Sequence, residues 1–209
     1  PVCLASPLRD VYKRQEMNSV DDFKGLKMRT PGLGGEVLTK MGGTVVNMPA
    51  GEIFTAMQTG AIDATEWIGP YNDLALGLHK AAKYYYTPGW QEPSVLFELD
   101  VNLKAWETLP PDLQAIVRAA ARDVNGDMLD DYNAKNMEAM EQLKADGVEV
   151  RRLPDEVLAR LKEVAAEVVE ASANADPVAK KVWEQQKAYL QRLYDYAESN
   201  EKDIYNIRG

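Results

Sequence analysis

Short apolar segments alternate with helical segments between residues 21 and 103, and turns rich in glycine and proline separate them. This alternation is typical of an α/β fold, in which helices cover the faces of a sheet and bury its apolar side chains. The expected strands lie at residues 26–29, 44–48, 61–67, 84–86 and 95–103. The expected helices lie at residues 35–41, 52–58 and 71–82.

Longer helices are expected in the second half of the chain. Between residues 113 and 132, apolar side chains recur three or four positions apart, which is the spacing of one helix face, and this helix should extend to about residue 144. A short strand at 148–153 and helices that start at residues 154 and 177 should follow. We expect these helices to pack across the α/β units, against one another or against a partner subunit, because a single amphipathic helix cannot bury its apolar stripe alone.

The charge and the rare residues exclude several classes of function. The chain has 33 acidic against 24 basic residues and a net charge of -9, so nonspecific attraction to nucleic acid is unfavourable. No apolar stretch approaches the roughly 20 residues that a membrane-spanning helix needs. Cys3 is the only cysteine, which excludes an internal disulfide and a multi-cysteine zinc site. Catalysis of the Ser-His-Asp or Cys-His type would depend on His79, the only histidine.

The first fifteen residues differ in character from the rest of the chain. They contain the only cysteine and show no clear period, and the segment RDVYKRQ resembles the translated adapter sequence that occurs in assembled environmental reads. We therefore predict that residues 1–15 are non-native and that the native chain begins near Glu16. An ordinary flexible arm is the alternative, since chain termini are commonly disordered.

The turn after the first expected strand, Arg29-Thr-Pro-Gly-Leu-Gly-Gly, is a candidate binding site. In α/β proteins such turns present free backbone amides and a helix N-terminus to a crevice, where phosphate or carboxylate groups bind. A dinucleotide site is disfavoured, because Val37 occupies the third glycine position of the G-x-G-x-x-G pattern. Arg29 is at the end of a strand, where its guanidinium can bind a carboxylate through two hydrogen bonds. A plain surface arginine is the alternative.

Two further segments place an acidic residue beside a tryptophan near a strand end. They are Asp63-Ala-Thr-Glu66-Trp67 and the segment from Tyr84 to Pro93, which contains Trp90 and Glu92. Two carboxylates from different strand ends can bind sodium or calcium together with backbone carbonyl oxygens, or they can form a general acid–base pair. The spacing alone does not separate these interpretations. The simpler alternatives are solvated loop carboxylates and tryptophans in the core.

Four segments of the chain resemble the solute receptors of TRAP transporters, which are the DctP-type periplasmic binding proteins, and in particular their α-keto-acid-receptor branch. The segments are DDFKGLKMRTPG, GGTVVNMPAGEIFTAMQTGAIDATEW, YYYTPGWQEP and NLKAWETLPPDLQAIV. The similarity covers residues 20–209 almost without interruption. It implies a periplasmic-binding-protein-like two-lobe α/β fold with long C-terminal helices, and a periplasmic location.

The resemblance also implies a set of site residues. In similar receptors the arginine of the RTPG-like segment binds the ligand carboxylate, and this position is Arg29. The residues that hold a sodium or calcium ion bridging to the ligand correspond to Glu66, Trp67 through its carbonyl, and Glu92. Arg29, Glu66, Trp67 and Trp90 would together bind a small organic monocarboxylate, such as the 2-oxo acid pyruvate. The two lobes would close on this acid and deliver it to the membrane permease, with no catalytic residue involved.

Complete receptors of this kind carry a signal peptide and a further α/β region upstream, so the resemblance implies that the first lobe is incomplete here. Residues 16–66 and about 100–150 would form the second lobe, residues 67–99 a remnant of the first lobe, and residues 151–209 the C-terminal helices that pack across both. We expect the 209-residue chain as written to bind ligand poorly and to expose apolar surface. A homodimer through the C-terminal helices is a further expectation.

A metal-assisted lyase or hydrolase that acts on a keto acid is the alternative function, with Glu66 and Glu92 as acid and base. Its weakness is that no second histidine and no lysine cluster accompanies these carboxylates in the sequence. Within the receptor hypothesis, pyruvate, longer 2-oxo acids, lactate and aromatic acids all stay open as ligands. Oxygen donors suit sodium and calcium equally, so the sequence does not choose between the two ions.

Overall fold

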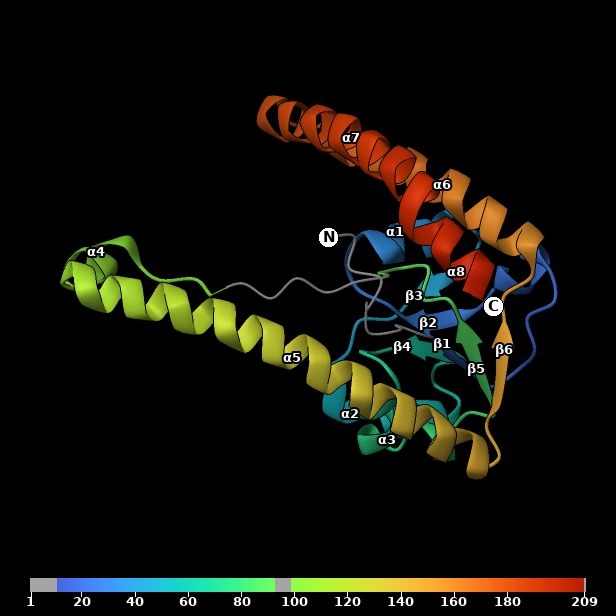
Figure 1. Ribbon diagram of the computed structural model, residues 1–209. Helices are drawn as coiled ribbons and strands as arrows, with labels where there is room; N and C mark the ends of the chain where they lie inside the picture. The colour runs from blue at the N-terminus through green and yellow to red at the C-terminus, as the bar shows by residue number, and fades with distance from the viewer. Residues whose placement is uncertain (1–10, 93–98, 209) are drawn as a thin grey trace.

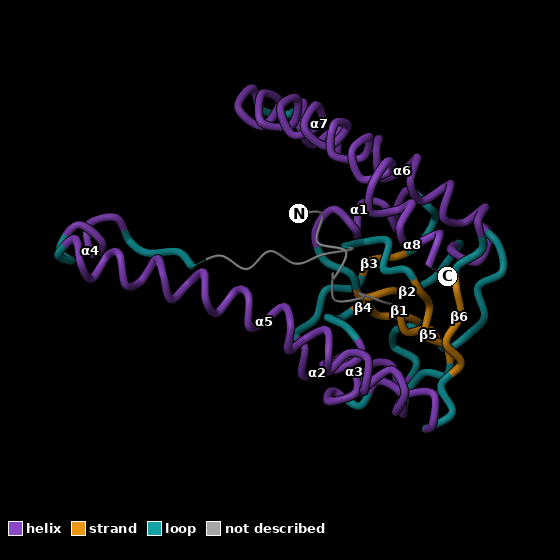
Figure 2. The backbone as a smooth tube through the Cα atoms, in the orientation of Figure 1, coloured by secondary structure: helices purple, strands orange, loops and turns teal. Residues whose placement is uncertain are grey.

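The computed structural model describes residues 11–92 and 99–208, in which one mixed sheet has the strand order β3-β2-β4-β1-β5-β6. Figure 2 shows this sheet between two layers of helices. The strands are β1 (Val11–Lys13), β2 (Lys27–Arg29), β3 (Thr44–Val45), β4 (Ala64–Glu66), β5 (Tyr84–Thr87) and β6 (Glu149–Arg152).

The strand directions bring most carboxyl ends to one edge of the sheet. β2 runs parallel to β3 and to β4, and β5 runs parallel to β6. β1 runs antiparallel to both of its neighbours, β4 and β5, so these two neighbours are parallel to each other. The loops that follow β2, β4 and β5 therefore leave the sheet at the same edge, where α/β proteins usually bind their ligands.

Helices cover both faces of the sheet (Figure 1). α1 and α6 pack against each other over one face, and the other face carries α2, α3 and the C-terminal half of α5. The α-helices are α1 (Gly32–Lys40), α2 (Ala50–Thr59), α3 (Pro70–Leu76), α4 (Leu103–Glu107), α5 (Pro111–Ala145), α6 (Asp155–Asn174), α7 (Pro177–Ala197) and α8 (Asp203–Arg208). There are also three short helical segments: η1 (Val20–Phe23) between β1 and β2, η2 (Leu78–Lys80) between α3 and β5, and η3 (Glu198–Lys202) between α7 and α8.

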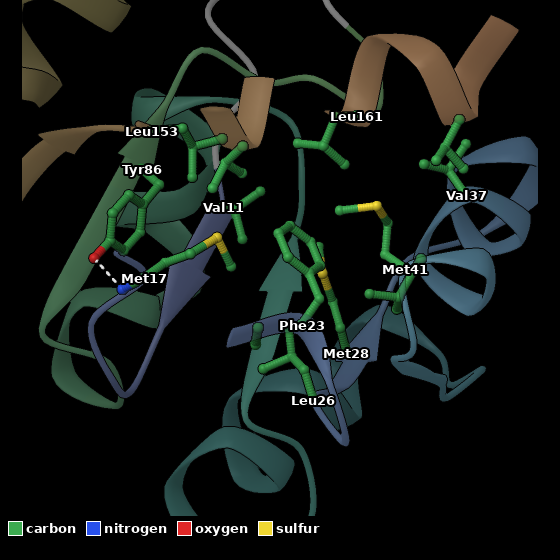
Figure 3. Close-up of a cluster of buried hydrophobic side chains, with 14 of the residues drawn as sticks. Val11, Met17, Phe23, Leu26, Met28, Val37, Met41, Tyr86, Leu153 and Leu161 are labelled. Carbon is green, nitrogen blue, oxygen red and sulfur yellow. Dashed lines mark hydrogen bonds between the residues drawn. The ribbon is translucent and has the colours of Figure 1, made fainter. Parts of the chain in front are cut away.

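The sheet has a hydrophobic core on each face, because successive side chains of a strand point to opposite sides. Tyr86 belongs to the core under α1 and α6, where Phe23 and Leu161 are also buried (Figure 3). The hydroxyl of Tyr86 accepts a hydrogen bond from the backbone N–H of Met17, at 2.7 Å. The preceding residue, Tyr85, is fully buried in the core on the opposite face.

The long helix α5 is packed only along its second half. Asn136, Ala139 and Leu143 are its buried residues, and all three lie near its C-terminal end. The first half extends away from the sheet and carries α4 at its far end (Figure 1). Apolar side chains of the predicted stripe are exposed there, with 60% of Ile116 and 62% of Val124 accessible to solvent. Within residues 11–92 and 99–208, no helix is long and apolar enough to cross a membrane.

Two predicted elements differ from the structure. The helix expected at 71–82 is split at Gly77, whose φ of 76° is left-handed, so α3 ends there and the short segment η2 follows. The strand expected at 95–103 lies partly outside the described residues, and its last residues are not a strand. Instead α4 begins at Leu103, because the side chain of Asn102 accepts a hydrogen bond from the Ala105 N–H and caps that helix.

The segments predicted to be a non-native adapter and a first-lobe remnant share one sheet with the strands of the predicted second lobe. β1 comes from residues 1–15, yet it lies between β4 and β5, and its Tyr12 is fully buried. Residues 11–13 are therefore an integral part of this fold and not a flexible arm, while the adapter origin of the segment stays a prediction. β5 comes from the expected first-lobe remnant at 67–99, and it joins the strands expected in the second lobe, because β1 bridges it to β4.

Candidate functional site

The ends of β2 and β4 build the candidate site. These two strands are neighbours, and their register places Arg29 opposite Thr65. Arg29 is the last residue of β2 and Glu66 is the last residue of β4, so both side chains leave the sheet at the shared carboxyl edge. The parallel pairing thus brings together two residues that are 37 positions apart in the sequence.

Arg29 and Glu66 form a buried ion pair. The Nη1 of Arg29 lies 2.5 Å from Oε1 of Glu66 and 3.4 Å from the Glu66 backbone oxygen. The side chains are 15% and 2% exposed, respectively, so water screens their interaction only weakly. The guanidinium carbon of Arg29 also lies 5.4 Å from the centre of the Trp67 ring, a cation–π contact. The structure therefore brings Arg29, Glu66 and Trp67 together.

The ion pair leaves Arg29 with donors for a ligand. A guanidinium carries five N–H groups, and both hydrogen bonds to Glu66 use Nη1. The fixed planar geometry of the remaining groups suits a second carboxylate. The pairing with Glu66 and the stacking on Trp67 hold the guanidinium in place before a ligand arrives.

Trp90 and Glu92 lie in the segment that follows β5, which leaves the same sheet edge. The ring of Trp90 packs edge-on against Phe23, with 6.4 Å between ring centres, next to the core under α1 and α6. This contact matches the core alternative for Trp90, and its role in ligand binding stays a prediction. Glu92 is exposed and has interactions of its own, and its role as a cation ligand also stays a prediction.

The oxygen donors at this edge suit a hard cation. Within the described part of the chain, no three His, Cys, Asp or Glu side chains gather closely enough to hold a metal ion by themselves. A cation here would therefore need backbone carbonyls or ligand oxygens in addition to the carboxylate of Glu66. Sodium and calcium accept such mixed oxygen ligands, whereas zinc sites usually include nitrogen or sulfur. The predicted set of Glu66, the Trp67 carbonyl and Glu92 fits this chemistry.

His79 lies away from this edge. It is part of η2, which precedes β5, and its Nε2 is 3.8 Å from Oδ2 of Asp146. Asp146 comes shortly before β6, and β5 and β6 run in parallel, so both residues lie near the amino ends of these strands. The only histidine is therefore near the sheet edge opposite to Glu66, where it does not contact the candidate site.

A buried carboxylate that the sequence analysis missed lies directly behind the site. Asp73 of α3 is fully buried, and its Oδ1 accepts hydrogen bonds from the backbone N–H groups of Ile68 and Gly69, both at 3.2 Å. Its Oδ2 accepts a hydrogen bond from the Tyr85 hydroxyl, also at 3.2 Å. Burial raises the pKa of Asp73 to about 7, although the hydrogen bonds oppose this change, and the charge of Glu66 adds to it. The only sequence signal was an acidic residue in the first turn after Gly69-Pro70.

Asp73 should make the stability of the fold depend on pH. In the unfolded chain its pKa is near 3.8, and in the folded chain it is about 7, so the folded state holds the proton more tightly. Protonated Asp73 stabilises the folded state. This contribution is fully present below about pH 4 and is lost as the pH rises through about 7. We expect the wild type to lose on the order of 4 kcal/mol of unfolding free energy relative to Asp73→Asn over this range. Urea denaturation of both proteins at several pH values measures this difference, and a constant difference would contradict the prediction.

Comparison with known proteins identifies the family of the chain. The family model described as bacterial extracellular solute-binding protein, family 7, or DctP, matches residues 6–176. The chain belongs to the DctP family. Proteins of this family are solute-binding receptors. A curated relative of this DctP chain is the monocarboxylate 2-oxoacid-binding periplasmic protein of a Nostoc species. It is 42% identical over 194 residues, which are 93% of this chain and 53% of that protein.

Solved structures of DctP relatives have the same fold. A TRAP periplasmic solute-binding protein from Colwellia psychrerythraea, with bound calcium and pyruvate, is 35% identical and superposes with a TM-score of 0.90 over 97% of this chain and 62% of that one. A TRAP solute-binding protein from Pseudoalteromonas atlantica, with bound sodium and pyruvate, is 33% identical. It superposes with a TM-score of 0.86 over the same fractions, 97% and 62%. The chain thus spans about half the length of the curated relative and somewhat more of these solved structures.

Proposed function

We propose that this DctP chain is the ligand-binding part of a TRAP transporter receptor that captures a small organic monocarboxylate, with a 2-oxo acid such as pyruvate as the favoured ligand. The observation that carries the proposal is the buried Arg29–Glu66 pair stacked on Trp67 at the carboxyl edge of the sheet. The 2-oxoacid-binding relative and the pyruvate-bound structures support the choice of ligand.

Arg29 and Glu66 have different tasks in this proposal. The ligand carboxylate binds to the guanidinium N–H groups of Arg29 that do not contact Glu66. A sodium or calcium ion bridges the other side of the ligand to the chain, held by Glu66, the Trp67 carbonyl and Glu92. Calcium and sodium both accompany pyruvate in the related structures, and this supports the cation. Because Glu66 is only 2% exposed, water screens little of its electrostatic interaction with Arg29 or with the cation.

The transport role rests on family membership. A receptor of this kind works in the periplasm, closes two lobes around its ligand and presents the closed form to the membrane permease subunits. The lobe boundaries predicted from the sequence belong to this proposal except at β5, which shares its sheet with the strands assigned to the second lobe. The signal peptide expected in an upstream region also belongs to it.

Calorimetric titration with pyruvate, in calcium, in sodium and after chelation of calcium, tests the proposal. The protein should extend this chain to the full length of its relatives. We expect tight binding that requires one of the two cations, and quantitative recovery of unchanged pyruvate by proton NMR. Absence of binding in both ions would overturn the receptor proposal, and steady consumption of pyruvate would favour the lyase or hydrolase alternative.

We also propose that two copies of the chain pair through the C-terminal helices. α7 packs against α6, and the indole N–H of Trp183 donates a hydrogen bond of 2.9 Å to Glu170. None of the described residues of α7 is buried, and large apolar side chains remain accessible along it. Examples are Val178, Tyr189 and Tyr194, which are 70%, 63% and 64% exposed. A second copy of α7 would cover this apolar surface.

A chain that ends at Ala175 should lose this pairing, because it lacks α7 and α8 while the buried face of α6 stays covered by the sheet layer. We expect light scattering to give the mass of two copies for the longer chain and of one copy for the shortened chain. Circular dichroism controls for correct folding of the shortened chain. An unchanged mass after shortening would contradict the pairing.

A further inference from the structure

The loop between β4 and α3 carries the Trp67 carbonyl, and one buried side chain holds this loop. Asp73 receives the N–H groups of Ile68 and Gly69 on Oδ1, and these are the two residues directly after Trp67. A carboxylate that accepts two successive backbone N–H groups restricts the orientation of both peptide planes.

The hydrogen bond from Ile68 fixes the orientation of the Trp67 carbonyl. This N–H and the carbonyl oxygen of Trp67 belong to the same peptide group, which is planar. The bond is trans, because the cis peptide found among the described residues is Thr87–Pro88. In a trans peptide the N–H and the carbonyl point in opposite directions. The Trp67 oxygen is therefore directed away from Asp73, and the hydrogen bond from its N–H to a carboxylate polarises the carbonyl and makes its oxygen a better ligand for a cation.

Asp73 is itself held firmly from two sides. The Tyr85 hydroxyl, from β5, donates a hydrogen bond to Oδ2. On the other side, α3 is attached to the long helix α5, because the backbone N–H of Tyr71 donates a hydrogen bond of 3.0 Å to Oδ1 of Asn136. Asn136 is only 6% exposed. The sheet and α5 thus fix the carboxylate that orients the loop.

We propose that Asp73 is a positioning residue for the cation site, which orients and polarises the Trp67 carbonyl through the Trp67–Ile68 peptide. This inference rests on the proposed function, in which that carbonyl binds the cation. It assigns a binding role to a buried acid that does not touch the ligand. Its role resembles that of the outer carboxylates that orient the ligands of metal sites, where replacement typically costs about 10- to 100-fold in metal affinity.

Replacement of Asp73 by asparagine, in a protein that extends this chain to the full length of its relatives, tests the proposal. Asparagine has the same shape and can still accept the two N–H groups, but it lacks the charge that polarises the peptide. At pH 8, we expect Asp73→Asn to weaken calcium binding about 10-fold, while pyruvate affinity at saturating calcium changes by less than about 2-fold. Calcium alone, followed by calorimetry and tryptophan fluorescence, is the first probe, and pyruvate in saturating calcium is the second. Tyr85→Phe should weaken calcium binding in the same direction by a smaller factor.

A structural role would give a different pattern. Asp131→Asn makes the same chemical change on the exposed surface of α5 and should leave calcium affinity unchanged. Unchanged calcium affinity in Asp73→Asn would overturn the proposal, and so would an equal loss of calcium and pyruvate affinity together with a lower melting temperature. If the unmodified protein binds neither calcium nor sodium, the proposed function fails and this inference fails with it.

Discussion

Replacing Arg29 with methionine should abolish pyruvate binding, with a loss of affinity of at least about 100-fold. Methionine has a similar length but offers no donor to the ligand carboxylate. Loss of one partner of a buried, hydrogen-bonded charge pair costs about 2 to 5 kcal/mol, and about 2.7 kcal/mol corresponds to a 100-fold change in affinity. Calorimetric titration with pyruvate in saturating calcium, in a protein that extends this chain to the full length of its relatives, measures this loss.

Stability must be separated from binding in this experiment. Arg29→Met leaves the carboxylate of Glu66 buried without its partner at 2.5 Å, and breaking a buried ion pair in this way destabilises a fold by about 3 to 5 kcal/mol. The double variant Arg29→Met/Glu66→Gln removes the uncompensated charge and should recover much of that stability without recovering binding. Arg29→Lys keeps the charge but loses the planar fork, so its affinity should be intermediate. Unchanged pyruvate affinity in Arg29→Met would contradict the role of Arg29.

The local architecture of the site could be predicted from the sequence. Glycine and proline mark the end of each strand and the start of the next helix in residues 21–60, so the expected strand at 26–29 and helix at 35–41 match β2 and α1 closely. Once these strands are assumed to be parallel, Arg29 and Glu66 are placed at one edge of the sheet. Their direct pairing also requires β2 and β4 to be neighbours, and this strand order was not predicted from the sequence.

Long-range packing could not be predicted in the same way. β1 has three residues, which is too short for a period to be visible, and its place between β4 and β5 depends on neighbours from distant parts of the chain. An acidic residue such as Asp73 is normally exposed. Its burial follows from backbone N–H groups and a tyrosine hydroxyl that converge on it, and the sequence pattern of α3 contains no sign of that convergence.

Glu66→Gln is expected to reduce calcium affinity at least about 100-fold. Glutamine keeps the size of the side chain and one oxygen donor, but it removes the negative charge nearest to the proposed cation. Glu66 is only 2% exposed, so little water screens its charge. The interaction between the ion and this buried carboxylate is therefore much stronger than it would be at the surface. Since the cation bridges to the ligand, pyruvate affinity at low calcium should fall together with calcium affinity. Titration with calcium alone and then with pyruvate measures both effects.

The comparison of two carboxylates makes this prediction specific. Glu92→Gln alters an exposed side chain, so its effect on calcium affinity should have the same direction and a smaller size than that of Glu66→Gln. Glu141→Gln, on the exposed surface of α5, is the matched control and should bind calcium as the unmodified protein does. Arg29 is intact in all three variants, so weak pyruvate binding that does not depend on calcium should survive in Glu66→Gln. If Glu66→Gln instead keeps its full calcium affinity, the cation is held elsewhere, and the buried pair serves only to orient Arg29.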